Sequence, residues 1–307
     1  MFVYLFPSRA LLDHWSCLQE LGECDSIVDI GCGCGIQALG LAARSSGKSK
    51  VKCIDINERA LRFTRFNFEW NGFDKPTLVL GNINEPSGRA YDESGATPKP
   101  WKELLGNSAT YIVSNPPFLP VPVHEVEISS RYGLFSSGGS TGEEFFENLV
   151  RLASGVLDRD DPSATLAVVS EFMNPDADFD LRLSSWWDDV GSARALLLTN
   201  EVALSATVYA QRRADDLEEA SQWEEHLRRE GITSVSPGLA FLKRNPMICR
   251  STPGSQDNSD SSVKDDGRIV ELTHYLVPKT HEGSIWTPTN HCARSFTRHQ
   301  LEEFSLL

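Results

Sequence analysis

Three glycines at alternate positions, directly after a short apolar segment, constrain the fold of this chain more than any other feature. Residues 26–30 form an apolar run typical of a buried strand, and Gly31, Gly33 and Gly35 follow it. Residues 36–44 then place apolar side chains at helical spacing. Glycines let a backbone turn sharply and approach a ligand without a Cβ in the way. This strand–turn–helix unit predicts an α/β protein.

The alternation of short apolar strands and amphipathic helices continues along most of the chain. The clearest helix covers residues 58–70 and is closed by Asn71 and Gly72. Strands and helices that alternate in this way predict a parallel sheet with helices on both faces. Strands are predicted at 26–30, 51–56, 77–80, 111–114, 165–172, 194–198, 234–242 and 269–277, and helices at 36–44, 58–70, 142–157 and 215–229.

Composition divides the chain into regions of different character. Residues 1–250 are predicted to form one domain, in which residues 1–25 are a helical lead-in. Residues 85–107 carry Pro, Gly, Ser and charge, which indicates a loop insertion with one helical turn near its end. Residues 251–268 are polar and poor in apolar side chains, and are predicted to be a flexible linker. Residues 269–307 then form a C-terminal extension.

The net charge limits the partners of this protein. Its 307 residues carry a formal charge of −14. An acidic protein repels phosphate backbones, so a long nucleic-acid footprint is disfavoured unless a local basic patch overrides the global charge. No apolar run approaches the ~20 residues that span a bilayer, and residues 2–6 lack the features of a secretory signal. We expect a cytoplasmic protein without a membrane partner, or an organellar one if the native N-terminus is longer.

The cysteines do not indicate a metal site. Seven are scattered along the sequence, which is an odd number. Cys32 and Cys34 flank a glycine, but no second pair follows at the spacing of a zinc site. The histidines of the C-terminal region lack ligand-like spacing as well. Buried free thiols and no bound metal are therefore expected.

The glycine turn and the acids around it indicate a particular ligand. Ile36 stands where the dinucleotide fingerprint G-x-G-x-x-G has its third glycine, so this turn leaves room for the amino-acid part of S-adenosylmethionine. Asp55, at the end of the second strand, is placed to accept both ribose hydroxyls, and Asp29 to bind the ammonium directly or through water. The predicted cofactor-binding residues are Asp29, Gly31, Cys32, Gly33, Gly35, Asp55, Ile56, Asn57, Asn82, Ile83 and Asn115.

Each of these residues also has a purely structural interpretation. A glycine triplet is often only a tight turn between a strand and a helix. Asp55 and Asn57 also fit the start of the helix at residue 58, where Asn57 is a natural cap. Such interpretations explain the residues one at a time, whereas a cofactor site explains them together with Asn115.

The segment Asn115-Pro116-Pro117-Phe118 follows the fourth strand and carries the predicted catalytic residues. An amide or aromatic amino nitrogen is a poor nucleophile because its lone pair is delocalised. The Asn115 side-chain oxygen and the Pro116 carbonyl can accept its two N–H groups and stabilise the charge that develops as a C–N bond forms. Pro116 and Pro117 fix their own φ and remove two competing donors, and Phe118 can stack on a flat substrate. The alternative is a proline turn that only closes the strand.

Two later segments also have two interpretations each. Residues 136–142, rich in glycine and serine, are either a connection capped by Thr141 before the next helix or a flap over the substrate. Trp186 and Trp187 are expected to anchor the core and not to form a stacking platform. The sequence leaves the role of residues 136–142 open.

Residues 29–35, 55–57 and 114–118 resemble, in order and content, motifs of a known family. They look like class I S-adenosylmethionine-dependent methyltransferases of the methyltransferase small domain group. That group includes HemK/PrmC-like glutamine methyltransferases and ribosomal-RNA guanine and adenine amino-methyltransferases. The resemblance covers residues 26–172 well, and residues 194–242 as a completion of the sheet.

The resemblance implies a Rossmann-like sheet of seven mostly parallel strands, with helices on both faces and an antiparallel last strand. It also implies that Asp55 holds the ribose, and that Asn115 and Pro116 hold the target nitrogen. Asn82 departs from the family pattern, because an acid often stands there to bind the adenine amine. Phe118 departs too, because glutamine methyltransferases commonly have Tyr at this position. Glutamine methyltransferases also usually carry a helical substrate domain ahead of the fold.

Together these features predict an S-adenosylmethionine-dependent N-methyltransferase that acts on a planar amide or exocyclic amino nitrogen. The acceptor is either an RNA base or a protein glutamine-type side chain, and the sequence does not decide between them. The alternative is a non-catalytic methyltransferase-like module that binds the cofactor and a partner.

Overall fold

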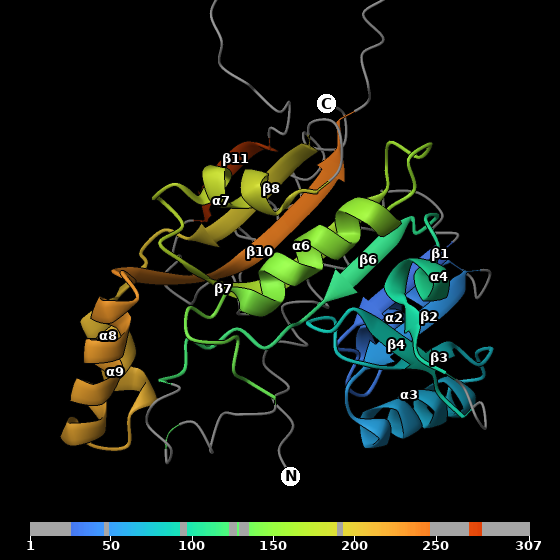
Figure 1. Cartoon of the computed structure of the whole chain (residues 1–307), viewed down its shortest axis with the longest axis horizontal. Helices are drawn as coiled ribbons and strands as arrows, with labels where there is room; N and C mark the ends of the chain where they lie inside the picture. The colour runs from blue at the N-terminus through green and yellow to red at the C-terminus, as the bar shows by residue number, and fades with distance from the viewer. Residues whose placement is uncertain are drawn as a thin grey trace, which may run out of the picture.

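The computed structural model describes residues 26–45, 49–92, 97–122, 128, 135–188, 193–245 and 270–277. These residues form one mixed sheet of eleven strands with helices packed against it (Figure 1). The predicted lead-in over residues 1–25 and the predicted linker over residues 251–268 lie outside the described residues. The same holds for residues 278–307, so the predicted domain map remains a prediction.

Seven strands form the centre of the sheet. Five of them run parallel, in the order β3, β2, β1, β6 and β7, and β10 lies antiparallel between β7 and β8. The carboxyl ends of β1, β2, β3 and β6 therefore meet at one edge, where the glycine turn and Asn115 follow. These strands are β1 Ser26–Ile30, β2 Lys50–Asp55, β3 Thr77–Leu80, β6 Tyr111–Ser114, β7 Thr165–Met173, β8 Ala193–Asn200 and β10 Ser234–Arg244.

Four further strands correct the prediction of a seven-stranded sheet. β4 (Ser87–Ala90) and β5 (Lys99–Pro100) continue the sheet beyond β3, and the two-residue β9 (Leu204–Ser205) pairs with β10. β11 (Val270–Val277) is the strand that the run at 269–277 predicted, and it pairs parallel with β8. The antiparallel β10 is therefore not the last strand. β11 covers an edge of β8 that would otherwise present unpaired backbone groups.

Trp101 explains why the predicted loop insertion contains strands. Its indole is buried, and its Nε1 donates to the Glu85 carbonyl at 2.7 Å. The ring fills the space beside Gly81 and Gly88, where a Cβ would approach it to 2.7 and 2.5 Å. The predicted helical turn is present as α4 (Trp101–Leu105). One large side chain thus holds this polar segment against the sheet.

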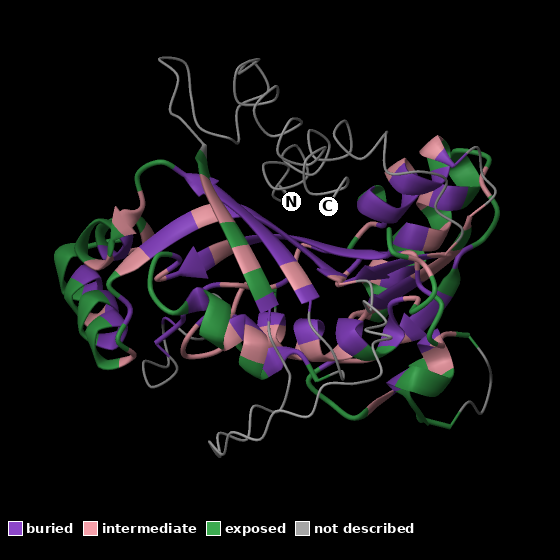
Figure 2. Ribbon diagram, turned by 90° about the horizontal axis from the view of Figure 1, so that it is seen from above, coloured by how far each residue is buried: buried purple, intermediate pink, exposed green. Residues whose placement is uncertain are grey.

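Helices cover the two faces of the sheet. α2 (Ile36–Arg44) and α3 (Glu58–Trp70) pack on one face, and α4, α6 (Glu144–Val156) and α7 (Phe179–Trp186) on the other (Figure 1). Side chains alternate accordingly: Cys53 packs with α2 and α3, whereas Ile54 packs with the opposite helices. Buried residues run along the strands between these layers (Figure 2). Trp186 and Trp187 are buried among them, so the expectation of a core anchor is confirmed.

Two helices form a hairpin at the end of the sheet. α8 (Ala206–Arg213) and α9 (Leu217–Arg229) stand between β9 and β10 in the chain and lie beside each other at one end of the molecule (Figure 1). The sequence predicted α9 but neither α8 nor α7. An apolar cluster joins the hairpin to the segment after β6, and its buried members are Leu119, Val121, Ile128, Met173, Tyr209, Ala210, Trp223, Leu227, Ile232 and Val235.

Candidate active site

The glycine turn between β1 and α2 requires glycine for steric reasons. Gly31, Gly33 and Gly35 have φ angles of 70°, 56° and 75°, in the left-handed region that residues other than glycine rarely adopt. The Gly31 and Cys32 amides both donate to the Ile54 carbonyl, at 2.9 and 3.0 Å. The turn is therefore fastened to the end of β2.

Helix α3 holds the turn from the other side. Thr64 Oγ1 donates to the Gly33 carbonyl at 3.1 Å, and Asn67 Nδ2 donates to the Cys34 carbonyl at 2.8 Å. The buried Cys32 thiol lies 3.5 Å from Thr64 Oγ1, and burial raises the pKa of this thiol well above its usual value. Cys32 is thus a neutral packing residue, and its backbone, not its sulfur, belongs to the turn.

Asp55 joins the turn to the start of α3. Its Oδ2 accepts from the Gly33 amide at 2.9 Å, and its Oδ1 accepts from the Asn57 amide at 2.8 Å. Burial raises the pKa of Asp55, although both amides favour its charged form. Asn57 is the cap of α3, because its side chain accepts from the Arg59 amide at 3.0 Å. The structural interpretation of Asn57 is therefore confirmed. The Ile56 amide also bonds the Asp55 carboxylate, which keeps one further acceptor site for a ligand.

Asp29 carries a buried oxygen that is not satisfied. Its Oδ2 accepts from the Ala38 amide at 3.1 Å, whereas Oδ1 is buried and has no hydrogen-bond partner in the described structure. The Asp29 pKa is raised to about 7, mainly by burial and to a smaller extent by the nearby Asp55 charge, against the effect of the Ala38 amide. A cationic group at this position would satisfy Oδ1 and restore the charged carboxylate.

The predicted residues after β3 are placed differently from one another. The Gly81 amide donates to the Asp55 carbonyl at 3.0 Å, so this segment lies beside the site. Asn82 Oδ1 accepts from the Asn84 amide at 3.0 Å and forms a local turn. The Ile83 side chain is only 8% exposed and belongs to the core cluster under α4 and α6. Ile83 can therefore contact a ligand only through its backbone, whereas the Ile56 side chain is 47% exposed.

Asn115 lies directly against the glycine turn. Ser114 Oγ donates to the Ile30 carbonyl at 2.7 Å and aligns the ends of β6 and β1. The Asn115 carbonyl oxygen is 3.9 Å from the position that a Cβ on Gly31 would take. Asn115 Oδ1 is buried and makes no hydrogen bond to any described residue. An unpaired buried acceptor costs free energy, so this oxygen is available to a donor from outside the chain.

The rest of the Asn115–Phe118 corner is held by residues 136–142. The Phe118 and Leu119 amides donate to the Ser136 carbonyl at 3.1 and 2.8 Å, and the Gly138 amide donates back to Leu119 at 2.9 Å. Gly142 has a φ of 77°, and a Cβ there would come within 2.6 Å of the Phe118 carbonyl oxygen. Pro116 is buried, and Pro117 is half-buried.

Phe118 and Thr141 show what these contacts do. Phe118 is half-buried, and it packs against the apolar cluster of the α8–α9 hairpin. Thr141 Oγ1 accepts from the Glu143 amide at 3.2 Å, but Glu143 is itself the N-cap of α6 and has no side-chain cap, so the prediction that Thr141 caps this helix is wrong. Residues 136–142 are thus hydrogen-bonded to the corner and set its backbone.

A charged cluster that the sequence did not reveal lies at the carboxyl end of β7. Glu171 accepts from Tyr209 Oη at 2.7 Å and from Arg213 at 2.6 Å. The Arg213 guanidinium also lies over the Tyr209 ring, 4.9 Å from its centroid. Tyr209 and Arg213 are one turn apart on α8, and that spacing was the only signal available. Asn115 follows β6, and β7 pairs with β6. The charged cluster therefore lies at the end of the strand that neighbours the one before Asn115.

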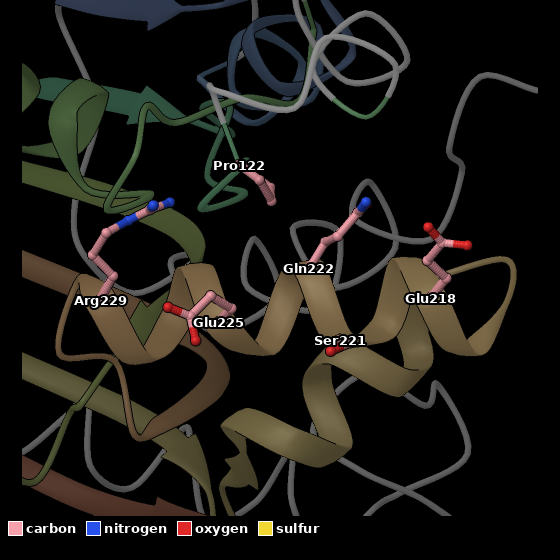
Figure 3. A pocket seen from close by; sticks show the side chains of 6 residues that line it. All are labelled: Pro122, Glu218, Ser221, Gln222, Glu225 and Arg229. Carbon is pink, nitrogen blue, oxygen red and sulfur yellow. The ribbon is translucent and has the colours of Figure 1, made fainter.

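A polar surface pocket lies near the corner but contains none of the predicted residues (Figure 3). It opens between Pro122 and the exposed side of α9. Its lining residues are Pro122, Glu218, Ser221, Gln222, Glu225 and Arg229. Among the described residues there is neither a cluster of His, Cys, Asp and Glu that could hold a metal ion nor a helix long and apolar enough to cross a membrane.

Comparisons with known proteins find similarity to methyltransferases in the first part of the chain. Residues 7–93 match the model of the methyltransferase small domain family. The chain is 39% identical to the ribosomal protein L11 methyltransferase of Vibrio campbellii over 86 residues, which are 28% of each chain. It is 40% identical to the enzyme of the same name from Syntrophomonas wolfei over 62 residues, 20% of each chain.

These matches cover 28% and 20% of the chain and of the relatives. They support the predicted class, a methyltransferase that uses S-adenosylmethionine, for the part that contains the glycine turn and Asp55. The family match ends before Asn115. A solved type I restriction-modification methyltransferase subunit from Streptococcus thermophilus is 13% identical to this chain, with a TM-score of 0.46. The match covers 96% of this chain and 52% of the subunit. A likeness at this level says nothing about function.

Proposed function

We propose that this protein transfers a methyl group from S-adenosylmethionine to a planar amide or exocyclic amino nitrogen. The observation that carries the proposal is the position of Asn115 Oδ1. It is a buried acceptor without a partner in the described structure, next to the glycine turn. A nitrogen bound by this oxygen is held beside the place where the turn would bind the cofactor.

The described residues fit S-adenosylmethionine at the glycine turn. The Asp55 carboxylate keeps an acceptor site for a ribose hydroxyl, and the unpaired Asp29 Oδ1 suits the ammonium group. The space beside Gly33 is open, since a Cβ there would meet nothing within 4 Å. The exposed Ile56 side chain offers an apolar surface for the adenine. When bound, the cofactor supplies an electrophilic methyl group on its sulfonium.

Asn115 and Pro116 act on the acceptor nitrogen. Asn115 Oδ1 and the Pro116 carbonyl accept its two N–H groups, which directs the lone pair at the methyl carbon. The N–C bond forms as the C–S bond breaks, and the positive charge that grows on nitrogen is stabilised by the same two oxygens. The nitrogen then loses one proton to water, so no strong general base is needed. The half-buried Phe118 screens the site and presents its remaining face to a flat group.

A protein acceptor is favoured over an RNA base. The relatives at 39% and 40% identity are named for methylation of a ribosomal protein. The formal charge of −14 also opposes binding to a long phosphate backbone. An acceptor side chain of the glutamine type has the two N–H groups that the Asn115 corner would bind. A planar amino group on an RNA base remains the competing substrate.

A non-catalytic module that binds S-adenosylmethionine and a partner is the alternative function. Such a module would need Asp55 and the glycine turn to bind the cofactor. It would not need a hydrogen-bond acceptor at Asn115 that orients a substrate nitrogen. An unpaired buried oxygen destabilises the fold by about 1–3 kcal/mol, a cost without benefit in a binding scaffold. The unpaired Asn115 Oδ1 therefore supports the enzyme.

A methyl-transfer assay tests this function and the class of acceptor together. The protein is incubated with tritiated S-adenosylmethionine and fractionated cell extract, and the products are treated separately with ribonuclease and with protease. We expect label that protease releases and ribonuclease does not, and less of it with the Asp55→Ala variant at limiting S-adenosylmethionine. Label released only by ribonuclease would make RNA the acceptor. Cofactor binding without any incorporated label would support the non-catalytic module instead.

A further inference from the structure

The outward side of α3 carries three aromatic side chains that the cofactor site does not use. Phe63, Phe66 and Trp70 are 42%, 53% and 77% exposed. Leu61, Thr64 and Phe68 form the opposite, core-facing side of the same helix. At 3.6 residues per turn, the three aromatic residues lie on one line with Arg59, which we call the α3 stripe.

Contacts within the α3 stripe keep its rings in place. The rings of Phe66 and Trp70 are stacked, with centroids 5.7 Å apart and an interplanar angle of 23°. The Arg59 guanidinium lies 5.6 Å from the centroid of Phe63. Contiguous exposed apolar surface of this kind marks an interaction site, and Trp and Arg are the residue types that dominate interface energetics. The stripe lies on the side of α3 away from Thr64, which bonds the glycine turn, so it does not overlap the proposed cofactor site.

We propose that the α3 stripe binds a second copy of this chain in an antiparallel helix pair. The order of its residues is self-complementary. With a two-fold axis between Thr64 and Arg65, Arg59 of one copy lies opposite Trp70 of the other, and Phe63 lies opposite Phe66. Residues 59 and 70 are centred between residues 64 and 65, and so are residues 63 and 66. A two-fold axis at that point therefore produces both pairs, as an isologous interface requires. Each copy thus places a cation over an indole and two phenyl rings against each other.

The charges beside the stripe fit the same arrangement. Arg62 and Glu69 lie on the same flank of α3, in its first and second halves, and both are exposed. In an antiparallel pair, residues of one flank meet their counterparts on the same flank, so Arg62 faces Glu69 of the second copy. Within one copy Arg62 pairs with Glu58 at 3.4 Å and Glu69 with Lys75 at 3.0 Å. Such exposed pairs are weak and can exchange partners.

The area of the stripe predicts a weak, concentration-dependent dimer. The exposed parts of three aromatic rings on two copies amount to roughly 700 Å², which is below the range of stable interfaces. The chain also carries a net charge of −14, so the two copies repel each other at low ionic strength. Salt screens this repulsion, and added salt should therefore strengthen the dimer.

Sedimentation velocity across a range of protein concentrations tests the proposal. We expect the wild-type sedimentation coefficient to rise with concentration, and to rise more at higher salt. Phe66→Ser should weaken association at least tenfold, with an unchanged circular dichroism spectrum. Leu217→Ser is the matched control, because Leu217 is 87% exposed on α9 and lies outside the stripe. Its association should equal that of the wild type.

A charge exchange tests the orientation of the two copies. Arg62→Glu and Glu69→Arg should each weaken the dimer, and the double variant should restore it. Methyl transfer per chain and binding of S-adenosylhomocysteine should be unaffected by all of these substitutions, so the outcome is independent of the proposed activity. A wild-type chain that stays monomeric overturns the proposal, even if the stripe then binds RNA or another protein. A dimer that Phe66→Ser leaves intact overturns it as well.

Discussion

The two halves of the sheet are built in different ways. The half made by β1, β2 and β3 with α2 and α3 is held by bonds between neighbouring units, such as Gly33 to Asp55, 22 residues apart. The half that begins at β6 depends on distant contacts. Arg213 binds Glu171 across 42 residues, and His226 Nε2 lies 2.8 Å from the Ser140 carbonyl, 86 residues away in sequence.

This difference matches what the comparisons detect. The family match covers residues 7–93 and ends before the second half. Local strand–turn–helix patterns leave a recognisable sequence trace, whereas distant contacts constrain residue types only in pairs. The first half is therefore the part whose sequence is similar to other methyltransferases, and under the proposed function the second half would select the acceptor. The following predictions test that division, starting with the largest effect.

Asp29→Asn should stabilise the fold by up to about 4 kcal/mol at pH 8. Folding raises the pKa of this carboxyl from 3.8 to about 7, so the folded state disfavours the charged form. The resulting loss of stability begins as the pH rises above about 4 and is complete above about 7, at 1.36 kcal/mol per unit of pKa. Chemical denaturation at pH 8 and pH 4 measures the gain, which should vanish at pH 4.

The same variant should bind S-adenosylhomocysteine more weakly, because the neutral amide no longer attracts an ammonium. A stabilised protein with undiminished ligand affinity would remove Asp29 from the cofactor site. Equal stability of variant and wild type at both pH values would mean that the buried oxygen is satisfied in solution.

Gly142→Ala should destabilise the protein by about 3 kcal/mol, and Gly35→Ala by less. Both glycines have positive φ, which costs other residues about 1–2 kcal/mol. A Cβ on Gly142 meets the Phe118 backbone oxygen at 2.6 Å, whereas one on Gly35 meets the Thr64 side chain at 2.7 Å, which can shift only by giving up its bond to the Gly33 carbonyl. Urea denaturation measures both variants, and the reverse order would contradict the account of the corner.

The two glycine variants should also separate the functions of the halves. Gly142→Ala displaces Phe118 and should raise the KM for the methyl acceptor, with cofactor affinity unchanged. Gly35→Ala distorts the turn and should weaken the cofactor. If both variants changed only cofactor affinity, residues 136–142 would have no role in acceptor binding.

Asp55→Ala should weaken binding of S-adenosylhomocysteine by about 2 kcal/mol, because the ribose hydroxyls lose a charged acceptor. Titration calorimetry measures the change. Asn57→Ala is the control, since it removes the cap of α3 and should cost about 1 kcal/mol of stability with little loss of affinity. Equal losses of affinity in the two variants would assign Asp55 to the helix start alone.

Sequence patterns predicted the first half well because its determinants are local. The strand before Gly31 is apolar except at Ser26 and Asp29, and α3 combines a cap at Asn57 with regular helical spacing. α8 was not predicted, because its short sequence includes the β-branched Thr207 and Val208. It is held by the packing of Tyr209 against Trp223, which only the tertiary structure reveals.

The candidate site was predictable in residue type but not in geometry. The order of glycines, acids and the Asn115 corner indicated which residues would meet at the sheet edge. The burial of Ile83 was not visible, because the residue after a turn can face either way. Nor could the sequence show that one oxygen of Asp29 and the side-chain oxygen of Asn115 lack partners in the described structure, since this depends on every neighbouring group.

The Asn115→Ala variant provides the most direct test of the central claim, that one half binds the cofactor and Asn115 directs the acceptor nitrogen. Affinity for S-adenosylhomocysteine and the rate of methyl transfer to the identified acceptor are measured on the same preparation. We predict an affinity within about twofold of the wild type and a rate lower by roughly a hundredfold, as when one aimed polar group is removed from a transition-state site. A wild-type rate of transfer would contradict the account and make the corner a structural turn.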